Sequence, residues 1–468
     1  STIGKGFNNG NPKDVNVTLD FSDEFGSSVS LNGAGDRLAI GAFLDDGAGN
    51  AASSTGAAYL FSFTGMNFNG GILESTIGSG YTGGKNVDVA NLDNGDRFAG
   101  AVSLNAAGDR LAVGAKFNDG AGNAVTSSGA AYLFSFTDID FNGGTLESTI
   151  GKGYSGTKDV DVANLDSSDR FGSSVSLNAA GDRLAVGAED DDGAGNVSSD
   201  SGAAYLFSFT NSDFSGGSLE STIGSGYAGG KNVDVTNLES NDNFGTSVSL
   251  NAVGDRLAVG AEDDDGAGNA ASDTGAAYLY SFSDTAFNGG TLESTIGSGY
   301  IGGKNVDVAN LEDSDSFGSS VSLNATGDRL AVGAFGDDGA GNAANIPGAA
   351  YLFSFTDTDF SDGVLESIFG KGYTGGNNVD VANLDSFDRF GSSVSLNGAG
   401  DRLAVGADRD DGASNASGSS GAVYLFSFSL PAGGALSSST ANFAENVGGD
   451  SEVLTADIET QLNAGTDV

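Results

Sequence analysis

One segment recurs along the chain at a fixed interval, and this regularity constrains the fold more than any other feature. The phenylalanine that opens Phe171-Gly-Ser-Ser-Val-Ser-Leu-Asn returns every 73 residues, without insertion or deletion between copies. A constant period of this length predicts an array of similar structural units. The six copies are Phe25, Phe98, Phe171, Phe244, Phe317 and Phe390.

Each unit contains four short segments with strand character, bounded by Gly, Asn or Asp. In the third unit, the first strand begins at Phe171 and carries only Gly and Ser on one face, which suits a crowded inner position. A turn at 178–182 leads into the second strand, 183–188. The third strand, 204–209, is apolar on both faces and is predicted to be buried on both. The fourth, 219–223, alternates as an outer strand should.

A unit that is small inside, apolar in the middle and polar outside is typical of a propeller blade. We therefore predict an all-β fold, a six-bladed β-propeller of four-stranded antiparallel blades. An open solenoid of stacked hairpins has the same period and remains an alternative. Closure is favoured because residues 1–4 repeat the end of a fourth strand, 148–151, and can complete the last blade beside 421–428. That pairing would remove two exposed sheet edges.

Composition excludes most kinds of active site. The chain has no His and no Cys, so nucleophile systems built on them, the usual zinc sites and disulfides are ruled out. Every acidic position recurs in equivalent places, and no asymmetric pair of carboxylates stands out, so we predict that the protein is not an enzyme.

Net charge and hydropathy limit the kinds of partner that the protein is expected to bind. With 63 Asp+Glu against 19 Lys+Arg the net charge is −44, which argues against nucleic acid and anionic membrane surfaces. No apolar run approaches the roughly 20 residues that span a bilayer, so no membrane insertion is expected. Because the chain begins at Ser1 without Met, we expect a mature or excised piece of a longer protein.

The loop between the second and third strands is the strongest candidate for a metal site. Its pattern, Asp-Asp-Gly-Ala-Gly-Asn, places oxygen ligands around a sharp turn, as calcium requires. A solvated acidic loop without metal is the alternative, and it is favoured in the second unit, where Asn118 removes a charge. The candidate ligands are Asp45, Asp46, Asn50, Asn118, Asp119, Asn123, Asp190, Asp191, Asp192, Asn196, Asp263, Asp264, Asp265, Asn269, Asp337, Asp338, Asn342, Asp410, Asp411 and Asn415.

Two further repeated polar motifs are given structural roles. The acidic turn before each Phe-Gly, such as 166–169, is predicted to be an Asx-type turn rather than a second metal site. The pair Asp182-Arg183 recurs in all six units. We expect its arginine to neutralise local carboxylates or to bridge neighbouring blades.

The combination of Phe171-Gly172 with Val186-Gly187-Ala188 in each unit resembles the FG-GAP repeat, the blade module of integrin α-subunit propellers and of many bacterial extracellular proteins. The resemblance covers residues 1–428. The second unit departs from it with Ala99 in place of Gly, and the integrin-type calcium loop between the two strands is shortened to a turn. The proline of the Gly-Ala-Pro signature is replaced by Phe43, Lys116, Glu189, Glu262, Phe335 and Asp408.

Residues 429–468 form a C-terminal extension or linker of different composition. Their last ten residues weakly resemble the start of a filamentous-haemagglutinin-type β-helix segment. Residues 433–440 imitate an outer strand, so they compete with residues 1–6 for the edge of the last blade. One of the two segments could be donated to a neighbouring molecule, which would build a fibre by strand exchange.

These features together predict a non-catalytic extracellular or cell-surface module of a bacterial surface or matrix protein, with an adhesive or scaffold function and calcium as a stabilising ion. Its partner would be a protein or glycan surface ligand, with self-association as a further possibility. A repeat lectin with glycan sites between blades is the alternative. The absence of Trp weighs against it, since sugar faces favour aromatic platforms.

Overall fold

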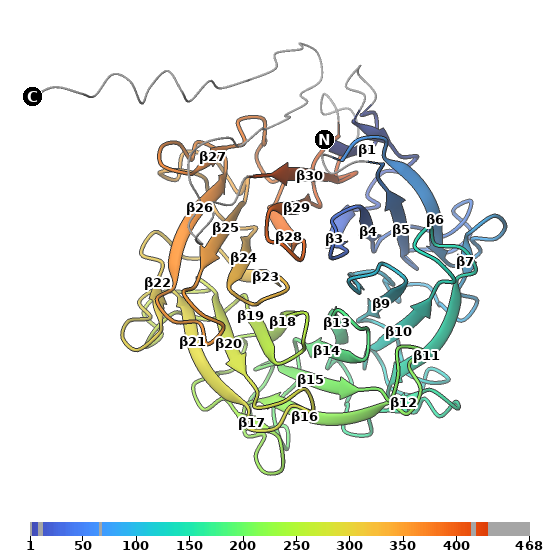
Figure 1. The fold of residues 1–468 in the computed structure, drawn as a ribbon, viewed down its shortest axis with the longest axis horizontal. Coiled ribbons are helices and arrows are strands. Elements are labelled where there is room, and N and C mark those ends of the chain that lie inside the picture. The colour runs from blue at the N-terminus through green and yellow to red at the C-terminus, as the bar shows by residue number, and fades with distance from the viewer. Residues whose placement is uncertain (1, 8–12, 65–67, 413–417, 429–468) are drawn as a thin grey trace, which may run out of the picture.

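The computed structural model describes residues 2–7, 13–64, 68–412 and 418–428. These residues form β-strands, turns and loops, without a helix. Their thirty strands make six five-stranded sheets, arranged as blades around a central axis (Figure 1). The prediction of a six-bladed all-β propeller is confirmed.

Every blade has the same strand order from the axis outward, and its first four strands are antiparallel neighbours. The innermost strands are β3 (Phe25–Leu31), β8 (Ala101–Leu104), β13 (Phe171–Leu177), β18 (Phe244–Leu250), β23 (Phe317–Leu323) and β28 (Phe390–Leu396). The second strands are β4 (Arg37–Ala42), β9 (Arg110–Ala115), β14 (Arg183–Ala188), β19 (Arg256–Ala261), β24 (Arg329–Ala334) and β29 (Arg402–Ala407). The third strands are β5 (Ala57–Ser62), β10 (Ala130–Ser135), β15 (Ala203–Ser208), β20 (Ala276–Ser281), β25 (Ala349–Ser354) and β30 (Ala422–Ser427).

The blades also contain a strand that the sequence did not reveal. Outside the fourth strand lies a fifth of only two residues, which pairs in parallel; in the third blade Ile223 is opposite Val233. Two residues are too few for a recognisable alternation, so the prediction of four strands falls one short. The fourth strands are β6 (Ile72–Gly78), β11 (Thr145–Gly151), β16 (Ser218–Gly224), β21 (Thr291–Gly297), β26 (Val364–Gly370) and β1 (Thr2–Gly4). The fifth are β7 (Val87–Asp88), β12 (Val160–Asp161), β17 (Val233–Asp234), β22 (Val306–Asp307), β27 (Val379–Asp380) and β2 (Val15–Asn16).

The N-terminal strand closes the ring, as predicted. β1 pairs antiparallel with β30, with Ile3 opposite Val423, so the first residues of the chain serve as the outer strand of the last blade. Ile3 is fully buried between the last blade and the first, where it shares a core cluster with Val423 and Phe25. The open solenoid is thereby excluded. The competing strand at 433–440, and with it the fibre hypothesis, lies outside the described residues.

A ring of serine hydroxyls joins the innermost strands. In each blade one serine of the innermost strand accepts a hydrogen bond from the backbone N–H of a leucine in the next blade, at 2.9 Å in all six cases. These contacts explain why the small face of the first strand carries Ser, because the hydroxyl satisfies a strand edge that would otherwise be unpaired. The pairs are Ser30–Leu104, Ser103–Leu177, Ser176–Leu250, Ser249–Leu323, Ser322–Leu396 and Ser395–Leu31.

A second ring, made of peptide groups alone, surrounds the axis at the turns between first and second strands. The N–H of Ala179 donates to the carbonyl oxygen of Ala252 in the next blade at 3.1 Å, and the same bond recurs around the ring until Gly398 donates to Gly33. The last blade is therefore linked to the first by the same bond that links any two neighbours. The residues of this ring are Gly33, Ala106, Ala179, Ala252, Ala325 and Gly398.

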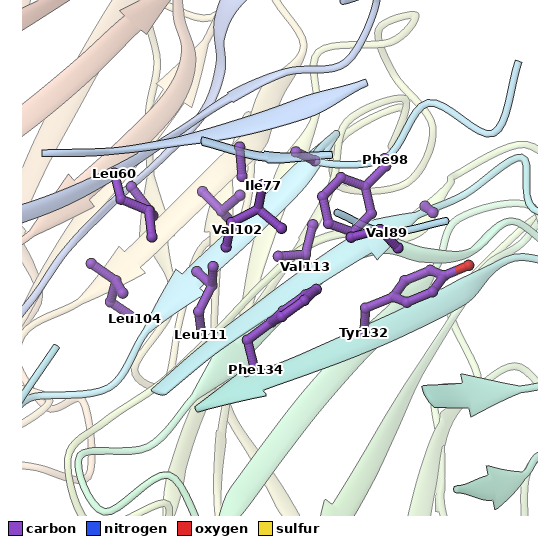
Figure 2. Packing of buried hydrophobic residues seen from close by; sticks show 14 of the residues in the cluster. Leu60, Ile77, Val89, Phe98, Val102, Leu104, Leu111, Val113, Tyr132 and Phe134 are labelled. Carbon is purple, nitrogen blue, oxygen red and sulfur yellow. The ribbon is translucent and has the colours of Figure 1, made fainter. Parts of the chain in front are cut away.

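The hydrophobic core consists of six clusters, each formed between two adjacent blades. In the cluster of Figure 2, Leu60 and Ile77 of the first blade face Phe98, Tyr132 and other residues of the second. Burial on both faces of the third strand, predicted from its sequence, is confirmed. Each sheet is thus stabilised by its neighbours rather than by a core of its own.

Glycine allows the blades to approach closely, and this accounts for the repeated Phe-Gly and Val-Gly-Ala motifs. A Cβ atom on Gly187 would lie 1.8 Å from the carbonyl oxygen of Gly245 in the next blade. Gly172 has φ +91°, and a Cβ there would lie 2.3 Å from the carbonyl oxygen of Ala130. In the second blade Ala99 takes the place of this glycine at φ 66°, and strand β8 begins only at Ala101.

The repeated arginine bridges neighbouring blades, as expected. Arg37 of the first blade donates from Nε to the carbonyl oxygen of Ile139 in the second at 2.6 Å, and its Nη2 lies 3.0 Å from Asp140. Lys85 of the first blade also donates to the carbonyl oxygen of Asp140 and pairs with Glu74 of its own blade. Arg110, Arg183 and Arg256 reach the loop between the third and fourth strands of the following blade in the same way, whereas Arg402 donates to the carbonyl oxygens of Ala34 and Gly35 in the first blade.

Candidate functional site

The two ends of the propeller differ in chemistry. One end, here called the turn face, carries the turns between first and second strands and the bridging arginines. The opposite end, the acidic face, carries the loops between second and third strands together with the turns that precede each innermost strand. The candidate metal ligands that lie within the described residues all belong to elements of the acidic face.

The first aspartate of each predicted calcium loop is a buried structural group. Asp191 is 3% exposed, and its carboxylate accepts hydrogen bonds from the N–H of Gly193 at 2.8 Å and from the hydroxyls of Tyr205 and Tyr227 at 2.6 and 3.0 Å. Burial raises its pKa, and the tyrosine hydroxyls oppose that effect. Asp45, Asp264, Asp337 and Asp410 accept a hydrogen bond from the tyrosine hydroxyl of their own third strand in the same way. In the second blade Asn118 takes their place, and its side-chain amide donates to the hydroxyl of Tyr132.

The second aspartate and the asparagine hold the loop in shape. Asp192 accepts the N–H of Asp200 at 2.9 Å, and the amide of Asn196 donates to Asp166 at 3.0 Å. The equivalent second aspartates, which all accept an N–H eight residues further on, are Asp46, Asp119, Asp265, Asp338 and Asp411. Among the equivalent asparagines, Asn50 donates to Asp20, Asn123 to Asp93 and Asn342 to Glu312. Asn269 has the same left-handed backbone as these residues. Asn415 lies outside the described residues.

The acidic turn before each innermost strand lies against this loop. Asp169 accepts the N–H of Asp166, three residues earlier, at 2.7 Å, so a side chain does hold this turn, but through a bond that differs from the i to i+2 bond of the predicted Asx-type turn. Burial, together with the charges of Asp191, Asp166 and Asp192, raises the pKa of Asp169 to about 7. Burial likewise raises the pKa of its counterparts Asp242, Asp315 and Asp388 to about 7. The turn before the innermost strand and the loop between the second and third strands are distant in sequence, yet together they form one cluster of carboxylates in each blade.

This cluster of carboxylates meets some of the requirements of a calcium site and fails others. The donors are hard oxygens, which suit calcium. The first aspartate, however, is already occupied by protein hydrogen-bond donors, and within the described ranges no set of three or more acidic side chains has the arrangement of a metal site. The additional Asp190 and Asp263 are engaged elsewhere: Asp190 pairs with Arg170 at 2.9 Å, and Asp263 accepts from Asn243 at 2.9 Å. Calcium binding stays a prediction.

A different set of residues, which the sequence reasoning did not treat as a site, lies nearer the axis on the acidic face. We call it the mouth ring. It comprises the residue before each repeated phenylalanine and the residue after each second strand. Its members are Glu24, Arg97, Arg170, Asn243, Ser316 and Arg389, together with Phe43, Lys116, Glu189, Glu262, Phe335 and Asp408.

The mouth ring breaks the symmetry of the propeller. Its first six members all have left-handed backbone, with φ between 51° and 58°, although glycine would adopt this conformation at lower cost. Residues that differ in charge and size are thus kept at positions of backbone strain, which is a feature of functional sites. The replaced proline of the Gly-Ala-Pro signature was the signal in the sequence, because its six substitutes have no common chemistry.

Basic and aromatic side chains gather in the second and third blades of this ring. The guanidinium of Arg97 lies 4.4 Å from the ring centroid of Phe117, and that of Arg170 lies 5.2 Å from the same ring. Lys116 and Arg170 both pair with Glu189, at 2.8 and 3.3 Å. These two cations hold the pKa of the buried Glu189 carboxyl below its usual range despite its desolvation.

The fourth blade also has a glutamate at this position, but it lacks the arginine that pairs with the glutamate in the third blade. Glu262 occupies the position of Glu189, but Asn243 stands where Arg170 stands in the third blade. Burial and the charges of Glu189 and Asp263 raise the pKa of Glu262 to about 8. Further round the ring, Asp408 is 9% exposed, its Oδ1 has no hydrogen-bond partner, and burial raises its pKa to about 7.

Comparison with known protein families agrees with this architecture. The FG-GAP repeat family matches the chain five times, over residues 20–61, 163–207, 236–280, 309–353 and 382–426. The second blade, in which Ala99 replaces the glycine of the motif, lies outside these matches. No curated protein matches the chain. With five family matches placed on five equivalent blades of one closed propeller, the chain belongs to the FG-GAP repeat family.

Proposed function

We propose that the protein is a non-catalytic, extracellular adhesion and scaffold module that binds a surface ligand on its acidic face. The observation that carries this proposal is the mouth ring, in which six otherwise similar blades present different side chains around one axis. A single asymmetric surface on a symmetric, rigid support suits recognition of one ligand. Membership of the FG-GAP repeat family supports a scaffold role for the blades.

Two further observations are consistent with this assignment. No helix among the described residues is long and apolar enough to cross a bilayer. The repeated carboxylate groups, such as that around Asp169, account for part of the charge of −44. Mutual repulsion of this kind destabilises a compact ring unless cations reduce it, which is the basis for proposing calcium as a stabilising ion outside the cell.

The test is to probe labelled protein against an array of immobilised peptides and an array of glycans at physiological salt. We expect retention on peptides and loss of that retention in Arg97→Ala, a mouth-ring variant. Asp362→Asn, an exposed substitution in a loop of the turn face, serves as the control and should bind as the unaltered protein does. Retention on glycans through several equivalent sites would instead establish a lectin, and retention on neither array would refute the proposal.

A further inference from the structure

We propose that the mouth ring binds an acidic side chain, Asp or Glu, of a protein partner, and that the guanidinium of Arg97 donates to its carboxylate. This inference rests on the proposed function and names the ligand chemistry of the same face. It is drawn from a comparison of the second blade with the third, where an arginine at the same position has different surroundings.

The third blade shows how an arginine of this ring is neutralised within the chain. Arg170, the residue before Phe171, pairs with Glu189 at 3.3 Å and with Asp190 at 2.9 Å. Both acids follow the second strand of the same blade, so the arginine and its partners come from one blade. Arg170 therefore has no need of a ligand.

In the second blade a cation takes the place of the first of these acids. Lys116 stands at the position of Glu189, and Phe117 stands at that of Asp190. Lys116 pairs with Glu189 of the next blade at 2.8 Å and cannot neutralise an arginine. Among the residues that the structure describes, Arg97 makes no side-chain hydrogen bond and no ion pair, and its close contacts are with aromatic rings.

Two aromatic rings hold the guanidinium of Arg97 in place. It lies 4.4 Å from the ring centroid of Phe117 and 5.6 Å from that of Phe43, which belongs to the first blade. A guanidinium over aromatic faces keeps its N–H donors at its edge, in the planar fork that fits a carboxylate. Arg97 is half-buried and its side-chain nitrogens reach solvent, so a ligand can approach these donors.

The acids nearest to Arg97 are engaged elsewhere. Asp96 accepts the N–H of Asp93 at 2.9 Å and the amide of Asn118 at 3.1 Å. Glu24, the member of the mouth ring in the first blade, interacts with Arg97 only through space, and more strongly with two arginines of the last blade. The chain carries 63 Asp+Glu, yet none of those within the described ranges forms an ion pair with this guanidinium.

The local charge agrees with an anionic ligand. This part of the ring contains three cations and two acids, namely Arg97, Lys116 and Arg170 with Glu189 and Asp190. Since the two acids pair with Lys116 and Arg170, the surplus positive charge lies on Arg97. A carboxylate would complete the balance through a bidentate, charge-assisted pair of hydrogen bonds.

The backbone of the second blade gives an independent observation at the same place. Arg97 has φ 53° and Ala99 has φ 66°, so two residues with side chains adopt the left-handed conformation within one turn. In each of the other five blades the second of these positions is glycine. Backbone strain of this kind clusters at ligand sites, and here it coincides with the unpaired guanidinium.

The experiment uses immobilised blocked pentapeptides of glycine that differ only in a central Asp, Glu, Gln or Lys. Labelled protein is applied in about 0.15 M salt, where the Debye length is about 8 Å, so that repulsion by distant acidic residues is screened. We expect the Asp or Glu peptides to retain the protein at least about tenfold better than the Gln peptide. Arg97→Gln should abolish that preference. Lys304→Gln, the same change of charge at an ion pair of the turn face, should preserve it.

Lys116→Glu is the decisive variant, because it places an acid where the third blade has Glu189 and so supplies Arg97 with a carboxylate from within the chain. Once calorimetry shows that it folds, it should lack the preference for acidic peptides. Arg97→Lys, which keeps the charge without the planar fork, should weaken the preference severalfold and serves if Lys116→Glu does not fold. Retained preference in Arg97→Gln or in folded Lys116→Glu, equal loss in Lys304→Gln, or a preference for the Lys peptide would overturn the assignment of Arg97.

The outcome also separates this inference from the function on which it rests. If peptides are retained through Arg97 but without preference for an acidic residue, the mouth ring is a ligand site and the carboxylate is the wrong ligand. If a carboxylated glycan is retained through Arg97 and no acidic peptide is, the ligand is not a protein side chain and the inference is equally overturned. If neither peptides nor glycans are retained, the inference and the proposed function fail together.

Discussion

The N-terminal strand β1 is predicted to act as the clasp of the propeller, and replacement of Ile3 by alanine tests this. Ile3 is fully buried and lies in the middle of a strand that is only three residues long. Truncating a buried isoleucine to alanine costs about 2–5 kcal/mol. With an unfolding entropy of about 2.1 cal/mol/K per residue, a ring of about 430 residues gives about 0.9 kcal/mol/K, so the melting temperature should fall by about 2–6 °C.

The matched control is Ile150→Ala. Ile150 is also fully buried and is the equivalent residue in β11, a strand of seven residues that is continuous with the chain on both sides. The local packing loss is the same, so any excess in Ile3→Ala measures the clasp. By differential scanning calorimetry we expect Ile150→Ala to shift one cooperative transition, and Ile3→Ala to add an earlier transition as the last blade opens. A single transition for Ile3→Ala, shifted no further than that of the control, would refute the reasoning.

Three other outcomes follow from the structure. Burial raises the pKa of Asp169 from 3.8 to about 7, so between these pH values the folded protein binds more protons than the unfolded chain, and its stability falls as pH rises. Without calcium, the melting temperature should therefore be higher at pH 5 than at pH 8. An equal or lower melting temperature at pH 5 would contradict this. Gly187→Ala should lower the free energy of unfolding in guanidinium by about 3 kcal/mol or more, because its Cβ would meet the backbone of the next blade. Gly195→Ala, which has open space around it, should lower it by about 1 kcal/mol. Similar losses in the two variants would show that the blades can move apart. The hydroxyl of Tyr280 is buried without a partner, so Tyr280→Phe, which restores the residue of the other blades, should stabilise the protein by about 1 kcal/mol, and a loss of stability would reveal a partner for the hydroxyl.

Most of the fold could be predicted from the sequence because repetition multiplies weak signals. A single Phe-Gly or Val-Gly-Ala segment predicts little, but six copies in one register establish the order of the strands and their faces. Even the closing strand was visible, since residues 1–4 repeat the end of a fourth strand. The fifth strand was missed because a pair such as Val233 and Asp234 is too short to show a pattern.

The candidate sites were harder to predict, for two physical reasons. The pattern Asp-Asp-Gly resembles a calcium loop, yet whether Asp191 faces solvent or a pair of tyrosines depends on the third strand and on Tyr227, 36 residues away. A repeat pattern also reveals only the residues that the units have in common. The mouth ring is distinguished by what they do not share, and the contacts between Lys116 and Glu189 cross from one blade to the next.

The peptide ring formed by residues such as Ala179 and Ala252 has a consequence for how the chain can be cut. Because the bond from Gly398 to Gly33 is the same as every other bond in the ring, the ring does not distinguish the blade formed by β28, β29, β30, β1 and β2 from the other five. What sets that blade apart is only that its outer strand comes from the opposite end of the chain. A circularly permuted chain that begins at Ser148 and joins the present ends through a linker would therefore rebuild the same propeller, with the clasp moved to the second blade.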